Sequence, residues 1–374
     1  MKVRLITLFI LLGLGLASCS EKEPEPQPVR TVLVYLLANN SLDSFAGPNI
    51  DSMIAGAAGQ NLNGGNLIVY YAPKNANPEL LQIKEENGKV NKFHLKEYEK
   101  RNSADPDVMR SVIREVVSQY PADSYGLVLW SHGTAWLPSD YQNRLKAFGQ
   151  DGSNWMEIDE LAKGLPDHLF DFILFDACYM ASVECVYELR DKADYILASP
   201  TETLADGWPY AEIIPQLFAT DLPLEKVCET FYDYYLNYAN PYATVSLTKT
   251  SELEALKDAV RAILADKTEE ELYQLDLSQM QRLEYLYKSP GMLYDMADYI
   301  RQLATDEQYA RFQTCIQKAL VYKAYTKEAF YAAPYRAYPI NSYCGLTAFV
   351  PQASLPKILD WYKERVSWYR AVYE

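Results

Sequence analysis

The sequence predicts an α/β protein: a mostly parallel central sheet covered by helices, followed by a largely helical C-terminal part. Short apolar runs alternate with helical patterns from Thr31 to Pro200, which is typical of parallel strands joined by helices. Two of these apolar runs end abruptly and are followed by residues with reactive side chains. With 374 residues, of which 49% are hydrophobic, the chain is long enough to bury a large core.

The predicted strands are apolar runs rich in β-branched residues. Residues 31–38 have this character throughout, which indicates a strand buried on both faces. Asn87-Gly88 stands between two alternating runs and predicts a hairpin turn. The remaining strand candidates are residues 66–71, 80–84, 89–93, 125–130, 172–175 and 193–198.

Apolar residues at helical spacing predict the helices. The clearest helix spans residues 108–120 and starts at Asp105-Pro106, because a carboxylate caps a helix and proline fits its first turn. An apolar run at 343–350 is a candidate strand that returns to the first sheet. The other expected helices are 42–58, 158–165, 253–265, 292–303, 307–322 and 355–372, with one more beginning after Tyr179.

The N-terminus predicts export. Lys2 and Arg4 precede a short apolar run, and Leu16-Ala17-Ser18-Cys19 resembles a bacterial lipobox. This resemblance implies cleavage before Cys19 and attachment of lipid to its thiol; a plain secretory signal that contains a cysteine is the alternative. Residues 20–29 are polar and proline-rich, as a tether between lipid and domain would be, and they favour the lipid anchor.

We therefore divide the chain into four segments. These are a signal peptide (1–18), a tether (19–30), an α/β region (31–215) and a mainly helical C-terminal part (216–374). The expected location is the bacterial outer membrane, on its periplasmic or surface face. A net charge of −15 argues against nucleic acid as a partner, because nucleic-acid binders normally present a basic face.

The six cysteines match neither a zinc pattern nor a disulfide framework. With Cys19 assigned to lipid, five remain, and an odd number leaves at least one free thiol. Most scattered cysteines are buried small hydrophobes. Cys178 is the exception, because it follows a predicted strand within Asp176-Ala177-Cys178.

A second predicted strand ends in Ser131-His132-Gly133, and the carboxyl ends of parallel strands meet at one edge of a sheet. A thiol there becomes a nucleophile when an imidazole takes its proton, and we expect the amides of the helix after Tyr179 to face it as well. The backbone N–H groups of Gly133 and Cys178 are candidate oxyanion donors. His94 and His168 are expected at the surface, and a structural role is the alternative for His132.

These two strand ends, with Ser-His-Gly at 131–133 and Asp-Ala-Cys at 176–178, resemble the clostripain family of cysteine peptidases, which share a fold with caspases. The resemblance extends to the loop Ala38-Asn39-Asn40 and to Asp206-Gly207-Trp208-Pro209-Tyr210. It implies a caspase-like α-β-α sandwich in which His132 is the general acid/base and Cys178 the nucleophile, without a third triad residue.

The same resemblance implies cleavage after Arg or Lys, with Asp176 and Asp206 holding the cation. Carboxylates suit this task, since they bind guanidinium strongly. The alternatives are a helix-capping role for Asp176 and a simple turn for Asp206.

The long loop 134–154 contains Arg144-Leu145-Lys146-Ala147, so we expect self-cleavage between Lys146 and Ala147, with an uncleaved surface loop as the alternative. The chemistry needs no cofactor. Family resemblance alone makes Ca²⁺ a candidate activator, since Asp151-Gly152-Ser153-Asn154 is only a fragment of a calcium-binding loop and the metal ligands are unknown.

The leading hypothesis is a lipid-anchored, monomeric cysteine endopeptidase acting on peptides and proteins with Arg or Lys at P1. One alternative is a thiol hydrolase or acyl transferase that uses the same dyad on a non-peptide acyl group. Another is a surface-binding lipoprotein with a vestigial dyad.

Overall fold

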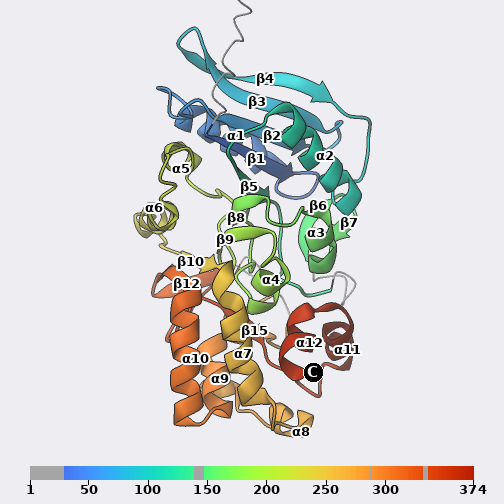
Figure 1. Ribbon diagram of the computed structural model, residues 1–374, viewed down its shortest axis with the longest axis vertical. Helices are drawn as coiled ribbons and strands as arrows, with labels where there is room; N and C mark the ends of the chain where they lie inside the picture. Colours follow the sequence, from blue (N-terminus) through green and yellow to red (C-terminus); the bar gives the residue numbers. More distant parts are fainter. Residues whose placement is uncertain (1–28, 139–146, 287–288, 332–335) are drawn as a thin grey trace, which may run out of the picture.

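The computed structural model describes residues 29–138, 147–286, 289–331 and 336–374 (Figure 1). A nine-stranded sheet runs through the molecule in the order β12-β10-β9-β8-β5-β1-β2-β3-β4. Its strands are β1 (Arg30–Leu37), β2 (Asn66–Ala72), β3 (Glu79–Glu86), β4 (Lys89–Glu97), β5 (Ser124–Trp130), β8 (Phe170–Asp176), β9 (Ala193–Ala198), β10 (Thr244–Lys249) and β12 (Leu320–Tyr325). The five middle strands are parallel, and antiparallel strands extend both edges, so the predicted α/β class is confirmed.

Two layers of helices cover the sheet. Alternate residues of β1 enter two separate cores, because successive side chains of a strand point to opposite faces. Helices α1 (Asp43–Gly56), α5 (Tyr210–Leu217) and α6 (Leu224–Leu236) pack on one face. Helices α2 (Pro106–Gln119), α3 (Ile158–Gly164) and α4 (Val183–Glu188) pack on the other.

Local sequence signals set several element ends as predicted. The Asp105 carboxylate accepts hydrogen bonds from the backbone N–H groups of Asp107 (2.9 Å) and Val108 (3.1 Å) and so caps α2. In the hairpin β3–β4, Asn87 and Gly88 have φ angles of 53° and 75°, the left-handed conformation that Asn-Gly adopts readily.

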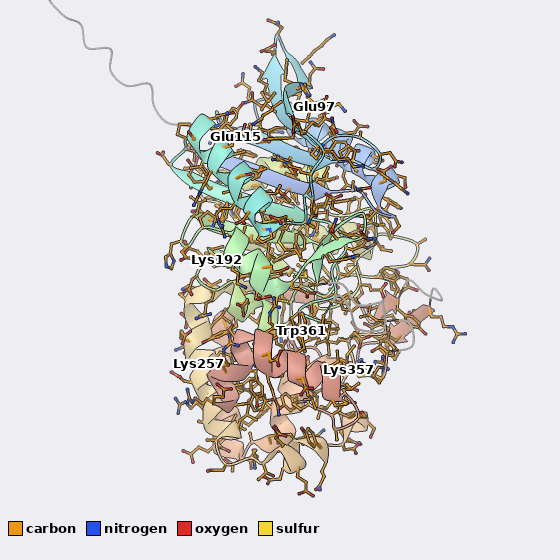
Figure 2. The ribbon with its side chains drawn as sticks, turned by 90° about the vertical axis from the view of Figure 1, so that its right-hand side faces the viewer. Glu97, Glu115, Lys192, Lys257, Lys357 and Trp361 are labelled. Carbon is orange, nitrogen blue, oxygen red and sulfur yellow. The ribbon has the colours of Figure 1, made fainter. Side chains whose placement is uncertain are left out.

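The edge hairpin is also tied to a helix. The Lys96 ammonium of β4 donates to both carboxylate oxygens of Glu115 on α2, at 2.7 and 2.8 Å. Figure 2 shows Glu115 on α2, below the hairpin that carries Glu97. This contact fixes the outermost strand of the sheet against a covering helix.

The C-terminal half adds more helices at the end of the molecule beyond β10 and β12 (Figure 1), and their apolar side chains join the core of the sheet face that α2 covers. They are α7 (Leu253–Leu264), α8 (Glu269–Tyr273), α9 (Met296–Leu303), α10 (Asp306–Ala319), α11 (Pro356–Arg365) and α12 (Ser367–Tyr373). One hydrophobic core runs from Leu33 of β1 to Val372 of α12. The C-terminal helices therefore share a core with the sheet. Within the described ranges, no helix has both the length and the apolar character to cross a bilayer.

The structure differs from the prediction for the run at 343–350. Its strand β15 (Thr347–Phe349) pairs with β11 (Leu293–Asp295) in a separate two-stranded sheet. It contacts the chain after Cys178 through an isolated bridge between Ser182 and Thr347 and through a hydrogen bond from the Phe349 N–H to Glu184. The strands that join the main sheet from this half are β10 and β12.

Several C-terminal boundaries were also predicted wrongly. The helix expected at 307–322 ends at Ala319, because residues 320–325 pair with β10 as an edge strand, and both strands were missed. The helix expected at 355–372 is two helices, separated by the extended backbone of Val366. The long loop 134–154 contains a missed hairpin, β6 (Phe148–Asp151) with β7 (Asn154–Met156). A further missed hairpin joins β13 (Glu328–Tyr331) and β14 (Arg336–Pro339).

Candidate active site

Four parallel strands deliver their polar ends to one edge of the sheet. Trp130, the last residue of β5, lies opposite Asp176, the last residue of β8. His132 and Cys178 each stand two residues beyond this matched pair. The sheet register thus brings the imidazole and the thiol to neighbouring positions at the carboxyl edge.

A pocket of about 330 Å³ opens at this edge. All four side chains assigned to catalysis and substrate binding line it: His132, Cys178, Asp176 and Asp206. Its other polar lining comes from Ser131, Glu202 and Thr203, and its apolar lining from Leu42, Phe45, Trp130, Leu204, Ala205 and Phe330.

The Cys178 thiol lies under the loop that follows β9. The backbone N–H of Thr203 donates to Sγ at 3.3 Å, and the thiol lies 3.8 Å from the Thr203 carbonyl oxygen and 3.6 Å from its hydroxyl. Burial, with a further contribution from the Glu202 carboxylate, raises the pKa of the Cys178 thiol to about 12. In this arrangement the thiol is protonated at neutral pH.

A strained turn follows Cys178. Tyr179 has a φ of 64°, in the left-handed region that a bulky side chain rarely adopts. Its N–H donates to the carbonyl of Thr201 (2.9 Å) and its hydroxyl to the carboxylate of Glu202 (2.8 Å). These bonds couple the turn to the loop that covers the thiol.

The expectation that a helix begins after Tyr179 and faces the thiol was wrong. Residues 180–182 are extended, because Ala181 donates to the Ser199 carbonyl (3.0 Å) and accepts from the Thr347 N–H (3.0 Å). Helix α4 starts only at Val183, and the Ser182 hydroxyl caps it.

The imidazole of His132 is partly buried and contacts Ser41. The Ser41 Oγ lies 2.8 Å from Nε2, and the Trp155 ring centre lies 6.3 Å from that of the imidazole. Sequence reasoning gave Ser41 no role, although it follows β1 at the same sheet edge. The sequence does contain a signal for Ser41, because this residue belongs to a polar segment that directly follows a buried parallel strand.

Gly133 lies tightly against the nucleophile segment. A Cβ atom at this position would stand 2.7 Å from the carbonyl oxygen of Cys178 and 3.2 Å from Cβ of Ala177. Only glycine permits this approach of the two backbones. The close approach is compatible with an oxyanion hole, and the role of the Gly133 and Cys178 amides remains a prediction.

Asp176 is almost fully buried, with 6% of its surface exposed. One carboxylate oxygen accepts hydrogen bonds from the Trp208 backbone N–H (3.2 Å) and the Tyr210 hydroxyl (2.8 Å). Burial raises the pKa of Asp176 to about 6, and these two hydrogen bonds oppose the shift. Asp176 does not cap α4, which excludes that alternative.

Asp206 is exposed at the pocket, next to Gly207. Gly207 has a φ of 77°, and a Cβ there would stand 2.6 Å from the Asp176 carboxylate. The Tyr235 hydroxyl donates to the Gly207 carbonyl. The turn that carries Asp206 is thus packed directly on Asp176.

Other sequence-based assignments fall in different places. Cys19 and Lys146 lie outside the described residues, whereas Ala147 is buried and its carbonyl accepts from the Thr134 N–H (3.0 Å). His94 and His168 are exposed. The five cysteines of the described part are free thiols: Cys178, Cys185, Cys228, Cys315 and Cys344.

The residues that the structure describes do not fit a calcium site. No group of three or more His, Cys, Asp or Glu among them is placed to hold a metal ion. The Asp151 carboxylate instead accepts from the Asn39 amide (2.6 Å) and the Ser103 N–H (2.5 Å), which ties two loops together. No reaction step is therefore assigned to a metal.

Comparison with known proteins identifies the family. The sequence profile of the clostripain family matches residues 34–355. The chain belongs to the clostripain family. Clostripain from Hathewaya histolytica is 31% identical over 132 residues, which are 32% of this chain and 25% of clostripain, so the chain aligns with about a quarter of that relative's length.

Solved structures of clostripain-family proteins extend the similarity across the fold. The inactive zymogen of a C11 protease from Parabacteroides distasonis is 42% identical, with a TM-score of 0.87 over 94% of this chain and 100% of that chain. A secreted C11 cysteine protease from Bacteroides thetaiotaomicron, in complex with an irreversible peptide inhibitor, is 32% identical, with a TM-score of 0.81 over 92% and 98%. The predicted caspase-like fold is confirmed.

Proposed function

We propose that this protein is a lipid-anchored cysteine endopeptidase that cleaves after Arg or Lys with a dyad of His132 and Cys178. The observation that carries the proposal is the pocket, in which a thiol, an imidazole and three carboxylates, those of Asp176, Glu202 and Asp206, line one cavity at the sheet edge. The clostripain family and the peptide-inhibited relative support a peptide as the substrate.

The reaction starts from the protonated thiol of Cys178. His132 accepts the Sγ proton, and the thiolate attacks the carbonyl carbon of the scissile peptide. The π electrons of the carbonyl move to its oxygen, for which we assign the N–H groups of Gly133 and Cys178 as donors. The imidazolium then protonates the leaving amine as the C–N bond breaks, and water hydrolyses the thioester with His132 as base.

The charge of the pocket supports a basic P1 residue. Asp176 and Asp206 supply two carboxylates, one buried and one exposed, in the same cavity. Carboxylates bind ammonium and guanidinium groups more strongly where water is partly excluded. Leu42, Phe45 and Leu204 offer apolar surface to the aliphatic stem of such a side chain.

Activation by self-cleavage between Lys146 and Ala147 is part of the proposal. The Thr203 N–H donates to the Cys178 thiol at 3.3 Å and so covers it, and a relative of the same fold is an inactive zymogen. Lys146 itself satisfies a P1 preference for basic residues. The lipobox-like segment ending at Cys19 supports attachment to the membrane, while calcium activation is supported by family resemblance alone.

A panel of fluorogenic peptides with Arg, Lys, Asp or Ala at P1 tests the proposal. Wild type is expected to turn over the Arg and Lys peptides only, and Cys178→Ala none. Assays in EDTA and in calcium, before and after limited proteolysis, cover both activation routes, and the intact masses of the two preparations report self-cleavage. No turnover of a basic peptide under any of these conditions would refute the proposed specificity, and a wild-type mass equal to that of the uncleaved chain would refute self-cleavage.

A further inference from the structure

The loop after β1 contacts His132, the general base of the proposed dyad. Ser41 is exposed, and its Oγ lies 2.8 Å from Nε2 of His132. The two residues come from strand ends separated by 91 positions in the sequence. β1 and β5 are parallel neighbours, with Leu36 opposite Trp130, so their carboxyl ends lie side by side.

A buried network behind this contact holds its two loops together. Asn40, which precedes Ser41, has 7% of its surface exposed and donates to the carbonyls of Leu37 (2.9 Å) and Gln150 (3.0 Å). The same amide nitrogen lies 3.5 Å from the hydroxyl of Ser131, the residue before His132.

Ser131 also forms hydrogen bonds with Leu37 and Gln150. Its hydroxyl donates to the Leu37 carbonyl (3.1 Å) and accepts from the Gln150 N–H (3.1 Å). Asn40, which precedes Ser41, and Ser131, which precedes His132, thus both form hydrogen bonds with the backbone of Leu37 and Gln150. Buried, satisfied polar networks are rigid, so the relative position of Ser41 and His132 does not depend on their exposed bond alone.

We propose that Ser41 is a positioning residue that accepts a hydrogen bond from Nε2–H of His132. This bond selects the neutral tautomer in which Nδ1 carries no proton and serves as the base. The inference rests on the proposed function of His132 and Cys178, and it adds a third residue that acts through the imidazole.

The proton balance follows from this tautomer. Nδ1 accepts the Sγ proton of Cys178, which leaves a thiolate and an imidazolium with protons on both nitrogens. Nε2–H continues to donate to Ser41 Oγ, so the hydroxyl dipole stabilises the positive ring. Nδ1 then releases its proton to the leaving amine, and the original tautomer is restored.

The proposal can be tested, because the hydrogen bond between Ser41 and His132 can have its donor on either side. A serine hydroxyl can also donate, and a hydroxyl that donates to Nε2 selects the tautomer with a proton on Nδ1. That ring cannot accept the thiol proton at Nδ1. Nuclear magnetic resonance of the ring nitrogens separates the two cases, and a chain with three histidines gives a simple spectrum.

The spectroscopic test uses full-length Cys178→Ala with ¹⁵N-labelled histidine, and the His132 signals are assigned by their loss in a Cys178→Ala/His132→Gln double variant. The expected spectrum shows His132 as the Nε2–H tautomer, and adding Ser41→Ala is expected to mix the two tautomers. An Nδ1–H tautomer with Ser41 present, or a spectrum unchanged by Ser41→Ala, would overturn the proposal.

The kinetic test uses wild type, Ser41→Ala, Ser41→Thr and Ser111→Ala on an Arg peptide. Ser41→Ala is expected to lower kcat roughly 3- to 10-fold with KM unchanged, the range that one hydrogen bond supplies, and to move the acid limb of the kcat profile to lower pH. Threonine keeps the hydroxyl and should restore both. Ser111 is an exposed serine of α2 that bonds its own helix, so its variant should match wild type.

Kinetics also separate this inference from the proposed function. If Ser41→Ala has the kcat and pH profile of wild type while Cys178→Ala is inactive, the positioning role is wrong and the dyad stands. If Cys178→Ala retains activity, the dyad itself is refuted, and the role of Ser41 with it.

Discussion

Gly133 packs its backbone directly against the segment that carries Cys178. Because the nearest atom to an added Cβ is a backbone oxygen at 2.7 Å, neither side can yield without moving the nucleophile. Gly133→Ala should lower kcat/KM at least about 100-fold and destabilise the fold by about 1–3 kcal/mol. Kinetics on an Arg peptide and urea unfolding measure the two effects.

Gly47 provides the control for that substitution. It lies within α1, and an added Cβ would meet nothing within 4 Å. Gly47→Ala should leave kcat/KM unchanged and change the free energy of unfolding by less than about 1 kcal/mol, because the helix propensity of alanine is opposed by its contact with the ring of Pro48. A Gly133→Ala variant that behaved like Gly47→Ala would show that the close approach is unimportant.

Asp176 offers a second prediction at the scale of one residue. Its folded pKa of about 6 means that the carboxylate loses its charge as the pH falls through 6, so kcat/KM for Arg peptides should fall there. Because the folded pKa is raised, this group favours the folded state at low pH and loses that contribution as the pH rises towards 6. Activity and this part of stability therefore change in opposite directions.

Asp176→Asn keeps an oxygen for the Trp208 N–H and the Tyr210 hydroxyl but removes the charge. It should lower kcat/KM for Arg peptides by roughly 10- to 100-fold and leave the variant folded. Asp171→Asn, at the opposite end of β8, is the matched control and should keep full activity. Equal activity of the two variants would remove Asp176 from P1 binding.

At the scale of elements, α4 is tied to the C-terminal half by a buried carboxylate. Glu184 is fully buried, and one oxygen accepts from the Phe349 N–H (2.8 Å) and the Tyr362 hydroxyl (3.3 Å). Burial raises the pKa of Glu184 to about 7. The stability that this group contributes is fully present below pH 4.5 and is lost as the pH rises through 7.

Glu184→Gln keeps the accepting oxygen and removes the charge. Its free energy of unfolding in urea should exceed that of wild type at pH 8.5, and the difference should shrink at pH 5 and disappear below pH 4.5. Glu188→Gln, on the same helix and bonded to the Ser367 N–H at 3.1 Å, serves as control. A difference between Glu184→Gln and wild type that did not depend on pH would contradict the assigned titration.

At the scale of the whole molecule, the N-terminal α/β region depends on the second half. Strand β10 covers the edge of β9, and Trp136, four residues after His132, packs its ring against Phe349 (5.3 Å) and Tyr362 (4.7 Å). The loop that carries the base thus rests on aromatic side chains from the C-terminal half.

Residues 29–215 alone should therefore not fold cooperatively. Calorimetry or urea unfolding is expected to show one transition for residues 29–374 and none for the truncated chain, because the truncation exposes β9 and half of a continuous core. A truncated chain with a sharp transition and dispersed amide resonances would show that the halves are separate domains.

The sequence by itself determined the parallel strands, their order along the chain and the residues at their ends. A strand buried on both faces must be apolar throughout, so the point at which the run stops is visible, as at Asp176 and Ser131. Caps and turns such as Asp105 and Asn87-Gly88 are equally local signals. The fold class, the family and the meeting of His132, Asp176 and Cys178 at one sheet edge followed from these features, whereas Asp206 was assigned from the family resemblance.

Only the tertiary structure decided which distant groups meet. Residues 320–325, which form the edge strand β12, continue the apolar pattern of α10. Their sequence does not distinguish a strand from a helix, and the pairing with β10 is what makes them a strand. The extended chain after Tyr179 likewise results from hydrogen bonds to Ser199 and Thr347 that lie far away in the sequence. The contact of Ser41 with His132 and the cover of Thr203 over Cys178 depend on sheet order, which spacing along the chain does not encode.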